Sequence, residues 1–414
     1  MKFLKNIYHK ILPLLGAVVY GFPSKKIVVI GVTGTKGKTT VTELINAGLE
    51  AAGYKTALNN SIRRKVGEAS GSNKGNSMFG RMYLQKFLRE AVNTGCKYAI
   101  IEVTSEGVRQ HRHERIEFDA AVFINIHPEH IESHGSFEKY REAKLEFFRY
   151  VKNYSKKPHK YFFVNHDDEN SSHFIKVIEP ADITYFSKSD LQSGLFGDFN
   201  KSNVGVAVAV LKKLGIKDEI INRGMANFKG VPGRMEFVQR EPFAVVVDYA
   251  HTPESLEAVY QTLSVSRSNV NGQSSMVVAP VAARKLICVL GSAGGGRDKW
   301  KRPEFGKIAE RYCKEIILTD EDPYDENPES ILEQIESGFS QTLNPKSETL
   351  KNFWKILDRR EAIKKAIELA KPGDVVIMTG KGSEKSIHVA GGKTIPWSDS
   401  SVALEALKEK YAGQ

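Results

Sequence analysis

The sequence predicts an α/β protein made of two domains, each built on a mostly parallel sheet. Short apolar runs rich in β-branched residues alternate with segments whose apolar residues recur at helical spacing. A glycine-rich loop directly follows the first of these runs, and glycine and proline interrupt the pattern at 230–233. We therefore expect a first domain over residues 25–237 and a second over 238–414, preceded by a separate apolar segment at 1–24.

The individual elements follow from the same patterns. In the first domain, strands are expected at 26–30, 98–103, 120–126 and 161–165, and helices at 82–91, 137–151 and 203–214. In the second domain, strands are expected at 243–248, 285–291, 315–319 and 374–379, with a surface loop at 264–283. Ligands of such sheets bind beyond the carboxyl ends of the strands, so functional residues are expected there.

The composition is ordinary for a globular enzyme, because 41% of the 414 residues are apolar and 26% are charged. The formal net charge of +11 suits anionic ligands such as nucleotides. No stripe of Arg and Lys interleaved with aromatic residues stands out. We therefore expect no nucleic-acid partner and attribute the charge to a basic surface.

The cysteines and the N-terminal segment bear on location. Cys96, Cys288 and Cys313 lack the paired spacing of a zinc site or a disulfide framework, which favours a reducing cytoplasm. The apolar segment 11–22 is flanked by lysines and is too short to cross a bilayer, which takes ~20 apolar residues. We expect a helix docked on the protein's own core, with a helix lying on a membrane surface as the alternative.

The most informative motif is the loop at 31–40, which reads Gly-Val-Thr-Gly-Thr-Lys-Gly-Lys-Thr-Thr. It lies between an expected strand and a segment with helical spacing, so backbone N–H groups and a helix N-terminus converge on an anion. In such a P-loop Lys38 can reach the β- and γ-phosphates and Thr39 can bind Mg²⁺. A glycine-rich turn that binds nothing is the alternative. The expected contacts to ATP or GTP are Gly34, Thr35, Lys36, Gly37, Lys38, Thr39 and Thr40.

Two further segments supply candidate metal ligands. Glu102 lies in an otherwise apolar strand, where a carboxylate is costly unless it is ion-paired or bound to a metal such as Mg²⁺. The segment 125–135 holds three histidines and two glutamates without a familiar zinc spacing, and we interpret it as the surroundings of a metal and a γ-phosphate. Spacing alone would leave Lys144 in water on the helix at 137–151.

Taken together and in this order, the motifs resemble the Mur ligase family, and within it most closely the tripeptide synthetases. The resemblance covers about residues 26–385. The segments that carry it are 31–40, 102–105, 125–135 with Lys144, 165–168, 197–203, 231–236, 248–253, 291–298 and 380–384.

The resemblance implies an ATP-dependent ligase with a Rossmann-like C-terminal domain. In this family a substrate carboxylate attacks the γ-phosphate of ATP, and an amine then displaces phosphate from the acyl phosphate. The same resemblance assigns roles to residues of this chain. Lys144 would be carbamylated, and Thr39, Glu102, His130 and Lys144 would hold Mg²⁺. Asn200 and Asn203 would contact adenine, Asp248 the ribose and Arg234 a phosphate, and the catalytic set would be Lys38, Lys144, His130 and Arg234.

The chain also departs from the family pattern. Glu129-His130 replaces an Asp-His pair, and Thr104-Ser105-Glu106 replaces Ser-Ser-His, which leaves Ser105 as a candidate contact to the acyl substrate. The segment 187–197 is shorter than the strand-rich stretch of the family. Only about two dozen residues precede the first strand, so we expect no N-terminal domain to grip the UDP of a substrate.

The last domain bears on the choice of amino acid. Family members that add meso-diaminopimelate carry Asp-Asn-Pro-Arg, whose Arg grips the distal carboxylate, whereas this chain has Glu321-Asp322-Pro323-Tyr324. Without the guanidinium, bidentate recognition of that carboxylate is lost. Asp322, Tyr324 and Glu384 would instead suit the amine of lysine or ornithine. A solvated acidic loop over 321–329 is the alternative.

We therefore predict a cytoplasmic ligase that uses ATP and Mg²⁺ to join an amino acid to a muramyl-peptide-type carboxylate in peptidoglycan synthesis. One alternative is a folylpolyglutamate- or polyglutamate-type ligase of the same superfamily. The other is a nucleotide-binding partner subunit without catalysis. Retention of Lys38, Glu102, His130 and Lys144 argues against the last, because a switch would not need Lys144.

Overall fold

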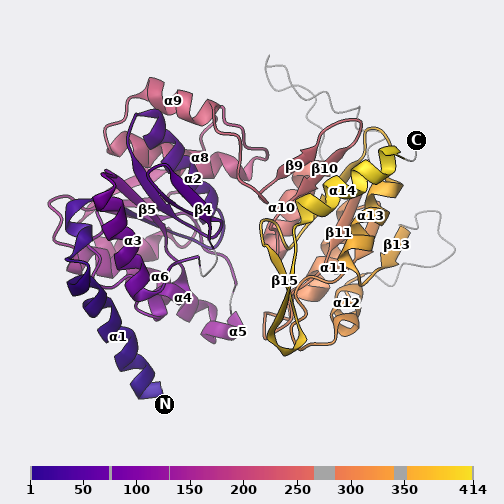
Figure 1. Cartoon of the computed structure of the whole chain (residues 1–414), viewed down its shortest axis with the longest axis horizontal. Helices are drawn as coiled ribbons and strands as arrows, with labels where there is room; N and C mark the ends of the chain where they lie inside the picture. Colours follow the sequence, from indigo (N-terminus) through magenta and orange to yellow (C-terminus); the bar gives the residue numbers. More distant parts are fainter. Residues whose placement is uncertain (1, 74–76, 130, 265–284, 340–351, 413–414) are drawn as a thin grey trace. The chain divides into compact units, whose positions relative to one another are not determined.

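The computed structural model describes residues 2–73, 77–129, 131–264, 285–339 and 352–412. The chain divides into two compact units, Met1–Lys229 and Gly230–Gln414 (Figure 1). The sequence had suggested a division after residue 237, but strand β9 (Glu236–Gln239) pairs with β10 (Ala244–Val247) and so belongs to the second unit. The N-terminal segment belongs to the first unit.

The first unit is built on an eight-stranded sheet in the order β4-β3-β2-β5-β1-β6-β7-β8. All neighbours are parallel except β3 with its two partners, which form an antiparallel edge. The strands are β1 (Val28–Thr33), β2 (Thr56–Asn59), β3 (Arg63–Val66), β4 (Ala69–Ser72), β5 (Tyr98–Glu102), β6 (Ala120–Phe123), β7 (Tyr161–Asn165) and β8 (Asp182–Phe186). The central strands are apolar throughout because helices cover both faces of the sheet.

Two hydrophobic cores lie on the two faces of this sheet. The first joins alternate residues such as Val29 to helices α3 (Arg81–Asn93), α6 (Phe137–Tyr154) and α7 (Ser171–Ile178). The second joins residues such as Ile30 and Val32 to α2 (Lys38–Ala51), α8 (Phe199–Lys213) and α9 (Asp218–Ala226). Figure 1 shows these helix layers. The shorter helices are η1 (Pro23–Lys26), α4 (Ser105–Arg109) and α5 (Ile131–His134), and α1 (Lys2–Val19) packs on α3.

The second unit carries a six-stranded sheet in the order β13-β12-β11-β14-β10-β9, in which only the β9–β10 pair is antiparallel. Helices α13 (Arg359–Leu369) and α14 (Asp399–Ala412) pack with the sheet in one core. A buried ion pair of 2.8 Å between Arg359 and Asp399 joins these two helices. The other elements are α10 (Pro253–Ser264), β11 (Leu286–Leu290), α11 (Lys301–Tyr312), β12 (Glu315–Leu318), α12 (Pro328–Glu336), β13 (Asn352–Lys355), β14 (Val375–Met378), β15 (Ser386–Val389), η3 (Ala390–Gly392) and β16 (Lys393–Pro396).

The predicted α/β class, the mostly parallel sheets and all of the named strands and helices are present. The antiparallel edge hairpin β3–β4 was not predicted, because β4 reads Ala-Ser-Gly-Ser and lies fully exposed. Its pairing depends on the backbone rather than on an apolar pattern. The predicted loop at 264–283 falls, except for Ser264, outside the described residues.

The prediction for the cysteines was wrong. Cys288 in β11 and Cys313 after α11 form a disulfide with their Cα atoms 6.0 Å apart, whereas Cys96 is free and buried. The two bonded residues are 25 positions apart in the chain, a spacing typical of no motif. They meet because β11 and the segment entering β12 are adjacent in the sheet. Among the described residues, no helix combines the length and apolar character needed to cross a bilayer.

Candidate active site

The centre of the first unit's site is the loop between β1 and α2. Gly37 directly precedes α2 and has φ of 80°, a backbone conformation that glycine adopts without strain. A Cβ atom at this position would lie 2.3 Å from Oδ1 of Asn203, so a side chain would also collide with α8. The first N–H groups of α2 have no partner within the helix, and the loop before them has a shape that requires glycine. Both features are typical of an anion site.

Two lysines add positive charge to this loop. The Lys38 ammonium donates to the carbonyl oxygens of Gly34 and Thr35, at 3.0 and 2.9 Å. Lys36 forms an ion pair of 3.0 Å with Glu129, from the segment after β6. The helix N-terminus and these two ammonium groups together have the charge that suits a polyphosphate.

Asn125 holds the loop in position, a role that sequence reasoning missed. Its Oδ1 accepts from the backbone N–H groups of Thr35 and Lys36, at 3.1 and 2.9 Å. Its Nδ2 donates to the Lys36 carbonyl at 3.2 Å. One indication of this role was present in the sequence. Asn125 follows an apolar strand, and the carboxyl end of that strand lies at the same end of the sheet as the loop.

Glu102 ends β5 beside the loop and is 2% exposed. Its two carboxylate oxygens accept from the Thr39 hydroxyl at 2.9 Å and from the Ser61 hydroxyl at 2.9 Å. Within the described part of the chain, no Lys, Arg or His forms an ion pair with Glu102. A buried carboxylate beside a threonine hydroxyl is a donor set that fits Mg²⁺. The ion-paired alternative for Glu102 therefore finds no partner among the described residues.

Lys144 is not the solvated lysine that its helical spacing indicates. It is 1% exposed, and its ammonium donates to the carbonyl of Gly34 at 2.7 Å and lies 4.7 Å from the centre of the Tyr140 ring. Burial, followed by the nearby charge of Lys38, lowers the pKa of Lys144 well below its usual value, against the opposing effects of Glu129 and Glu102. Lys38 and Lys144 therefore donate to the same carbonyl oxygen, that of Gly34.

The histidine-rich segment is only partly described. His130 lies outside the described residues, so its predicted role stays a prediction. Ser105 at the start of α4 lies 3.2 Å from Nε2 of His134, and both side chains are buried. This contact brings the histidine segment to Ser105, which lies three positions after Glu102 in the sequence.

Asn200 and Asn203 lie in the first turns of α8 and are both 6% exposed. The Asn203 amide donates to Oδ1 of Asn200 at 2.7 Å, and Asn203 is the residue that a side chain at Gly37 would strike. The structure therefore brings this predicted nucleotide-binding pair next to the phosphate loop.

In the second unit, Asp248 and Arg234 lie near one another. Both carboxylate oxygens of Asp248 accept backbone N–H groups, from Met235 and Ala250 at 2.7 Å each. Arg234 stacks its guanidinium over the Tyr249 ring at 4.1 Å. Asp248 thus holds the backbone at Met235 and at Ala250. This structural role is in addition to the ribose contact predicted for it.

Asp322 and Glu384 are held by a buried lysine. Lys381 is fully buried and donates to both oxygens of Asp322 at 2.9 Å and to Glu384 at 2.6 Å. Burial lowers the pKa of Lys381, but the carboxylates of Glu384 and Asp322 outweigh it and raise the pKa overall. One positive charge therefore offsets part of the negative charge that the sequence assigned to this pocket.

Tyr324 follows Pro323 with φ of 52° and stacks on His388 with ring centres 5.1 Å apart. The guanidinium of Arg297, from the glycine-rich turn after β11, lies within electrostatic range of Tyr324, Tyr249 and Glu384. Sequence reasoning included Arg297 in a motif without giving it a role. In the structure it is a second cation near Glu384, in addition to Lys381.

Comparison with known proteins decides the family. Residues 32–211 match the model of the Mur ligase middle domain, and residues 233–382 match that of the Mur ligase, glutamate ligase domain. The UDP-N-acetylmuramoyl-L-alanyl-D-glutamate--2,6-diaminopimelate ligase of Aquifex aeolicus (strain VF5) is 35% identical over 94% of this chain and 79% of its own length. The chain belongs to the Mur ligase family.

Other relatives agree with this assignment. The UDP-N-acetylmuramyl-tripeptide synthetase of Roseiflexus sp. (strain RS-1) is 34% identical over 95% of this chain and 81% of its own length. A solved 2,6-diaminopimelate ligase superposes with a TM-score of 0.58 at 26% identity, covering 93% of this chain and 79% of that structure. Members of the Mur ligase family are ATP-dependent ligases, and this chain is an enzyme of that class.

A more distant structure shares the fold alone. The folylpolyglutamate synthase of Mycobacterium tuberculosis, solved with ADP and AMPPCP, superposes with a TM-score of 0.69 at 15% identity. The match covers 97% of this Mur ligase family member and 94% of the synthase.

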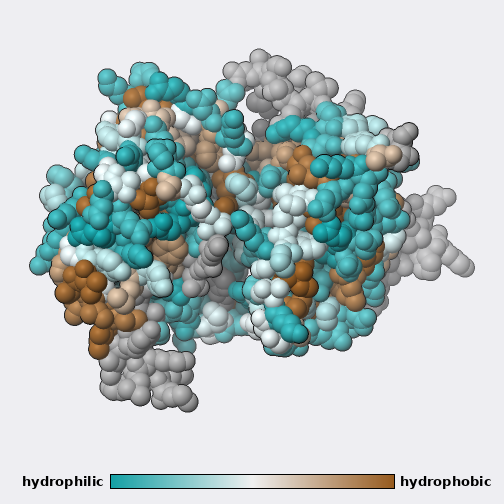
Figure 2. Space-filling view, in the orientation of Figure 1, coloured by the Kyte–Doolittle hydropathy of each residue, from teal (hydrophilic) through white to brown (hydrophobic). Residues whose placement is uncertain are grey.

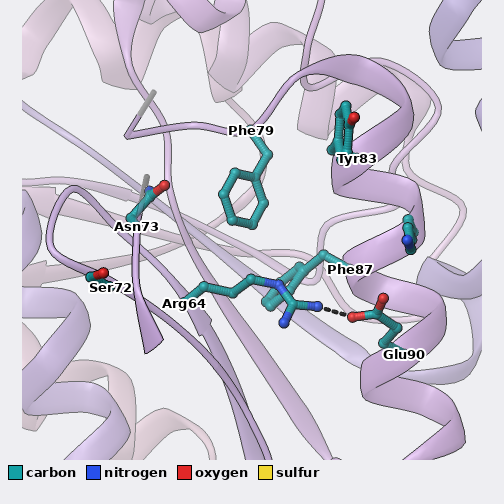
Figure 3. A pocket seen from close by; sticks show the side chains of 8 residues that line it. Arg64, Ser72, Asn73, Phe79, Tyr83, Phe87 and Glu90 are labelled. Carbon is teal, nitrogen blue, oxygen red and sulfur yellow. Dashed lines mark ion pairs between the residues drawn. The ribbon is translucent and has the colours of Figure 1, made fainter. Parts of the chain in front are cut away.

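A cavity of about 440 Å³ lies in the first unit beside β3 and α3 (Figure 3). Figure 3 shows the Phe87 ring of α3 beside the guanidinium of Arg64 on β3, with the rings of Phe79 and Tyr83 further from it. Its walls are tied to the loop that contacts Glu102, since Asn73 donates to the Asn60 carbonyl at 2.6 Å and Ser61 reaches Glu102. The residues that line the cavity are Arg64, Ser72, Asn73, Phe79, Tyr83, Lys86, Phe87 and Glu90.

Proposed function

We propose that this enzyme activates a substrate carboxylate by phosphorylation at the phosphate loop and joins it to an amino acid. The observation that carries the proposal is Lys144, a buried amine at 2.7 Å from the loop carbonyl of Gly34. A modified lysine at this place would add oxygen ligands for a metal in the neighbourhood of Glu102 and Thr39. The lowered pKa of Lys144 favours the neutral amine that such a modification needs.

The modification is carbamylation. The neutral Lys144 amine attacks CO₂ and loses a proton, which leaves a carbamate whose oxygens resemble those of a carboxylate. Glu102 and Thr39 would hold one Mg²⁺, and the carbamate with His130 would serve the second. When bound, the metal neutralises charge on the transferred phosphoryl group. Lys38 and the N-terminus of α2 would orient the phosphates and stabilise charge as it develops.

The resemblance implies nucleotide contacts for residues of each unit, taken separately. Asn200 and Asn203, next to Gly37, would contact adenine, as the resemblance implies. Within the second unit, Arg234 would contact a phosphate and Asp248 the ribose, as the resemblance implies. The Tyr249 ring under Arg234 supports this proposal, because it fixes the guanidinium in one orientation.

For the acyl substrate we propose a muramyl peptide that ends in a free carboxylate. The named relatives act on UDP-N-acetylmuramoyl peptides, according to their names, and cover most of this chain. The cavity lined by Phe79, Tyr83 and Lys86 is the place where we expect part of this substrate to bind, because aromatic rings and a cation suit a sugar or base that carries negative charge.

The second candidate is a folate- or polyglutamate-extending ligase. The observation that favours it is the fold similarity to folylpolyglutamate synthase over nearly the full length of both chains. Sequence identity favours the muramyl substrate, since it is 35% to the diaminopimelate ligase and 15% to the synthase. A partner subunit without catalysis fits least, because Lys38, Glu102 and Lys144 keep the arrangement that the reaction needs.

A phosphate-release screen tests the proposal. The enzyme, ATP and Mg²⁺ are combined with UDP-N-acetylmuramoyl-L-alanyl-D-glutamate or dihydrofolate, each with lysine, ornithine, meso-diaminopimelate or glutamate. We expect release only when a muramyl substrate and a diamino acid are both present, with lysine or ornithine preferred over meso-diaminopimelate by roughly 5- to 150-fold in kcat/KM. That range corresponds to ~1–3 kcal/mol for a second carboxylate left unpaired.

The substitution Tyr324→Arg tests the origin of this preference. Lys381 is committed to Asp322 and Glu384, and Arg359 to Asp399, which leaves Arg297 as the nearby cation for one carboxylate of the amino acid. Tyr324→Arg should reduce the difference in kcat/KM between lysine and meso-diaminopimelate. Tyr324→Phe should leave this difference unchanged. A wild-type preference for meso-diaminopimelate would contradict the proposal, and a preference for dihydrofolate with glutamate would favour the second candidate.

The cavity is tested by Tyr83→Ala. Tyr83 is 71% exposed, so its loss should leave the stability unchanged and raise KM for the muramyl substrate about fivefold, since an aromatic contact contributes roughly 1 kcal/mol. KM for ATP and kcat should not change. Tyr185→Ala, which removes a ring that is 50% exposed on β8, is the matched control. Equal KM values for both variants and wild type would exclude the cavity as the binding site.

A further inference from the structure

Over residues 11–19, helix α1 has two apolar faces, of which one is covered by α3 and the other is exposed. Pro13, Gly16 and Ala17 are buried on the face toward α3. The two helices are in close contact there, because a Cβ atom at Gly16 would lie 3.2 Å from the Cα of Met82 and 3.3 Å from Cγ of Gln85. This face matches the predicted docking on the protein's own core.

The C-terminal end of α1 is fastened to α3 by Arg89. The guanidinium donates to the carbonyl of Tyr20 at 2.7 Å and to that of Gly21 at 2.9 Å. These bonds satisfy carbonyls that the end of a helix leaves without a partner. The orientation of α1 on the first unit is therefore fixed, and with it the face that points to solvent.

The outer face of α1 is a continuous apolar stripe. Its members are Ile11, Leu14, Leu15, Val18 and Val19, which are 54%, 41%, 46%, 57% and 59% exposed. Their spacing of three and four residues puts them on one side of the helix. Figure 2 shows them as a brown patch at the lower left of the molecule, over α1. Five large apolar side chains in one exposed stripe indicate a surface that contacts something else.

The charge around this stripe selects the partner. The first acidic residue of the chain is Glu43, whereas lysines occur at 2, 5, 10, 25 and 26. Lys25 and Lys26 lie in η1, shortly after the end of α1 at Val19, and are exposed. A second copy of the chain would bring like charges together at this face. Anionic lipid headgroups would complement the lysines while the acyl region receives the apolar stripe.

We propose that α1 lies in the surface of an anionic bilayer and holds the enzyme there through Ile11, Leu14, Leu15, Val18 and Val19. The inference rests on the geometry of α1 and is independent of the proposed substrate. It combines the two interpretations of the N-terminal segment, a helix docked on the protein's own core and a helix lying on a membrane surface. The helix docks on α3 with one face, as expected, and this docking is what presents the other face to the membrane.

The test is sedimentation of the full-length enzyme with vesicles. Wild type is expected to bind vesicles of equal parts phosphatidylglycerol and phosphatidylcholine, more weakly at high salt, and to bind pure phosphatidylcholine poorly. Leu15→Gln combined with Val18→Gln should weaken binding about tenfold or more. Lys25→Glu combined with Lys26→Glu should remove the preference for phosphatidylglycerol. Leu404→Gln on α14, where the leucine is 47% exposed, is the matched control and should bind as wild type does.

Three outcomes would overturn the proposal. The first is a wild-type enzyme that does not bind the phosphatidylglycerol vesicles. The second is unchanged vesicle binding by the Leu15/Val18 variant, once its melting temperature and its ligase rate without vesicles have been found equal to those of wild type. The third is a concentration-dependent dimer in scattering measurements that the same variant abolishes, since it would assign the stripe to a second copy.

Discussion

Replacing Lys38 with alanine should abolish amide formation while leaving the protein folded. Among the described residues the Lys38 ammonium donates to two loop carbonyls, so its removal takes away charge at the phosphate loop and little packing. The loss of such a group typically lowers kcat at least ~10²-fold. Phosphate release and amide formation measure the rate, and thermal unfolding reports on the fold.

The matched control for this prediction is Lys55→Ala, which removes an exposed lysine of the same unit. It should have wild-type activity and a melting temperature close to that of wild type. If Lys38→Ala forms the amide at a near-normal rate, the phosphate loop does not serve ATP, and the assignment of this site to catalysis fails.

Replacing Lys144 with alanine should leave almost no activity. The amine is buried beside the loop, and its removal takes away the group on which the carbamate is proposed to form. Small carboxylates such as acetate should restore part of the rate to Lys144→Ala by occupying the vacated volume. Lys144→Met, which keeps the volume but has no amine, should be equally inactive and should not be rescued.

Carbamylation of Lys144 would also make the rate of the wild-type enzyme depend on CO₂ and pH. Because carbamate formation consumes the neutral amine and releases a proton, depletion of CO₂ should reduce the rate more at lower pH, and bicarbonate should restore it. The pKa of Lys144 is lowered, so the neutral amine is available nearer neutral pH than on an ordinary lysine. Lys139→Ala, an exposed lysine on the same helix, is the control. A fully active Lys144→Ala enzyme would return Lys144 to a structural role.

Features that are contiguous in sequence could be predicted. The loop at 31–40 and the central strands have apolar runs and glycines in one stretch, so their class and order followed directly. Lys144 shows the limit of this reasoning. Its position on α6 predicted exposure, and only the family resemblance gave it a role, since burial depends on how α6 lies against the phosphate loop.

Features that depend on distant segments could not be predicted. Lys381 and Asp322 are 59 residues apart and meet only because β12 and β14 both end at the same edge of the sheet. Asn125 reaches the phosphate loop across 90 positions, and the disulfide joins residues 25 positions apart. In each case the sheet order, rather than the local sequence, makes the contact.

The ion pairs that hold Lys381 bear on the range of amino acids that the enzyme can accept. Its ammonium is held by Asp322 and Glu384 before any amino acid arrives, so these three charged groups lose little conformational entropy on binding. A rigid template of this kind discriminates sharply, because it cannot rearrange to fit a second ligand. If the amino acid binds against this template, the enzyme should be a specialist, and a change of substrate would require replacing several of these side chains together.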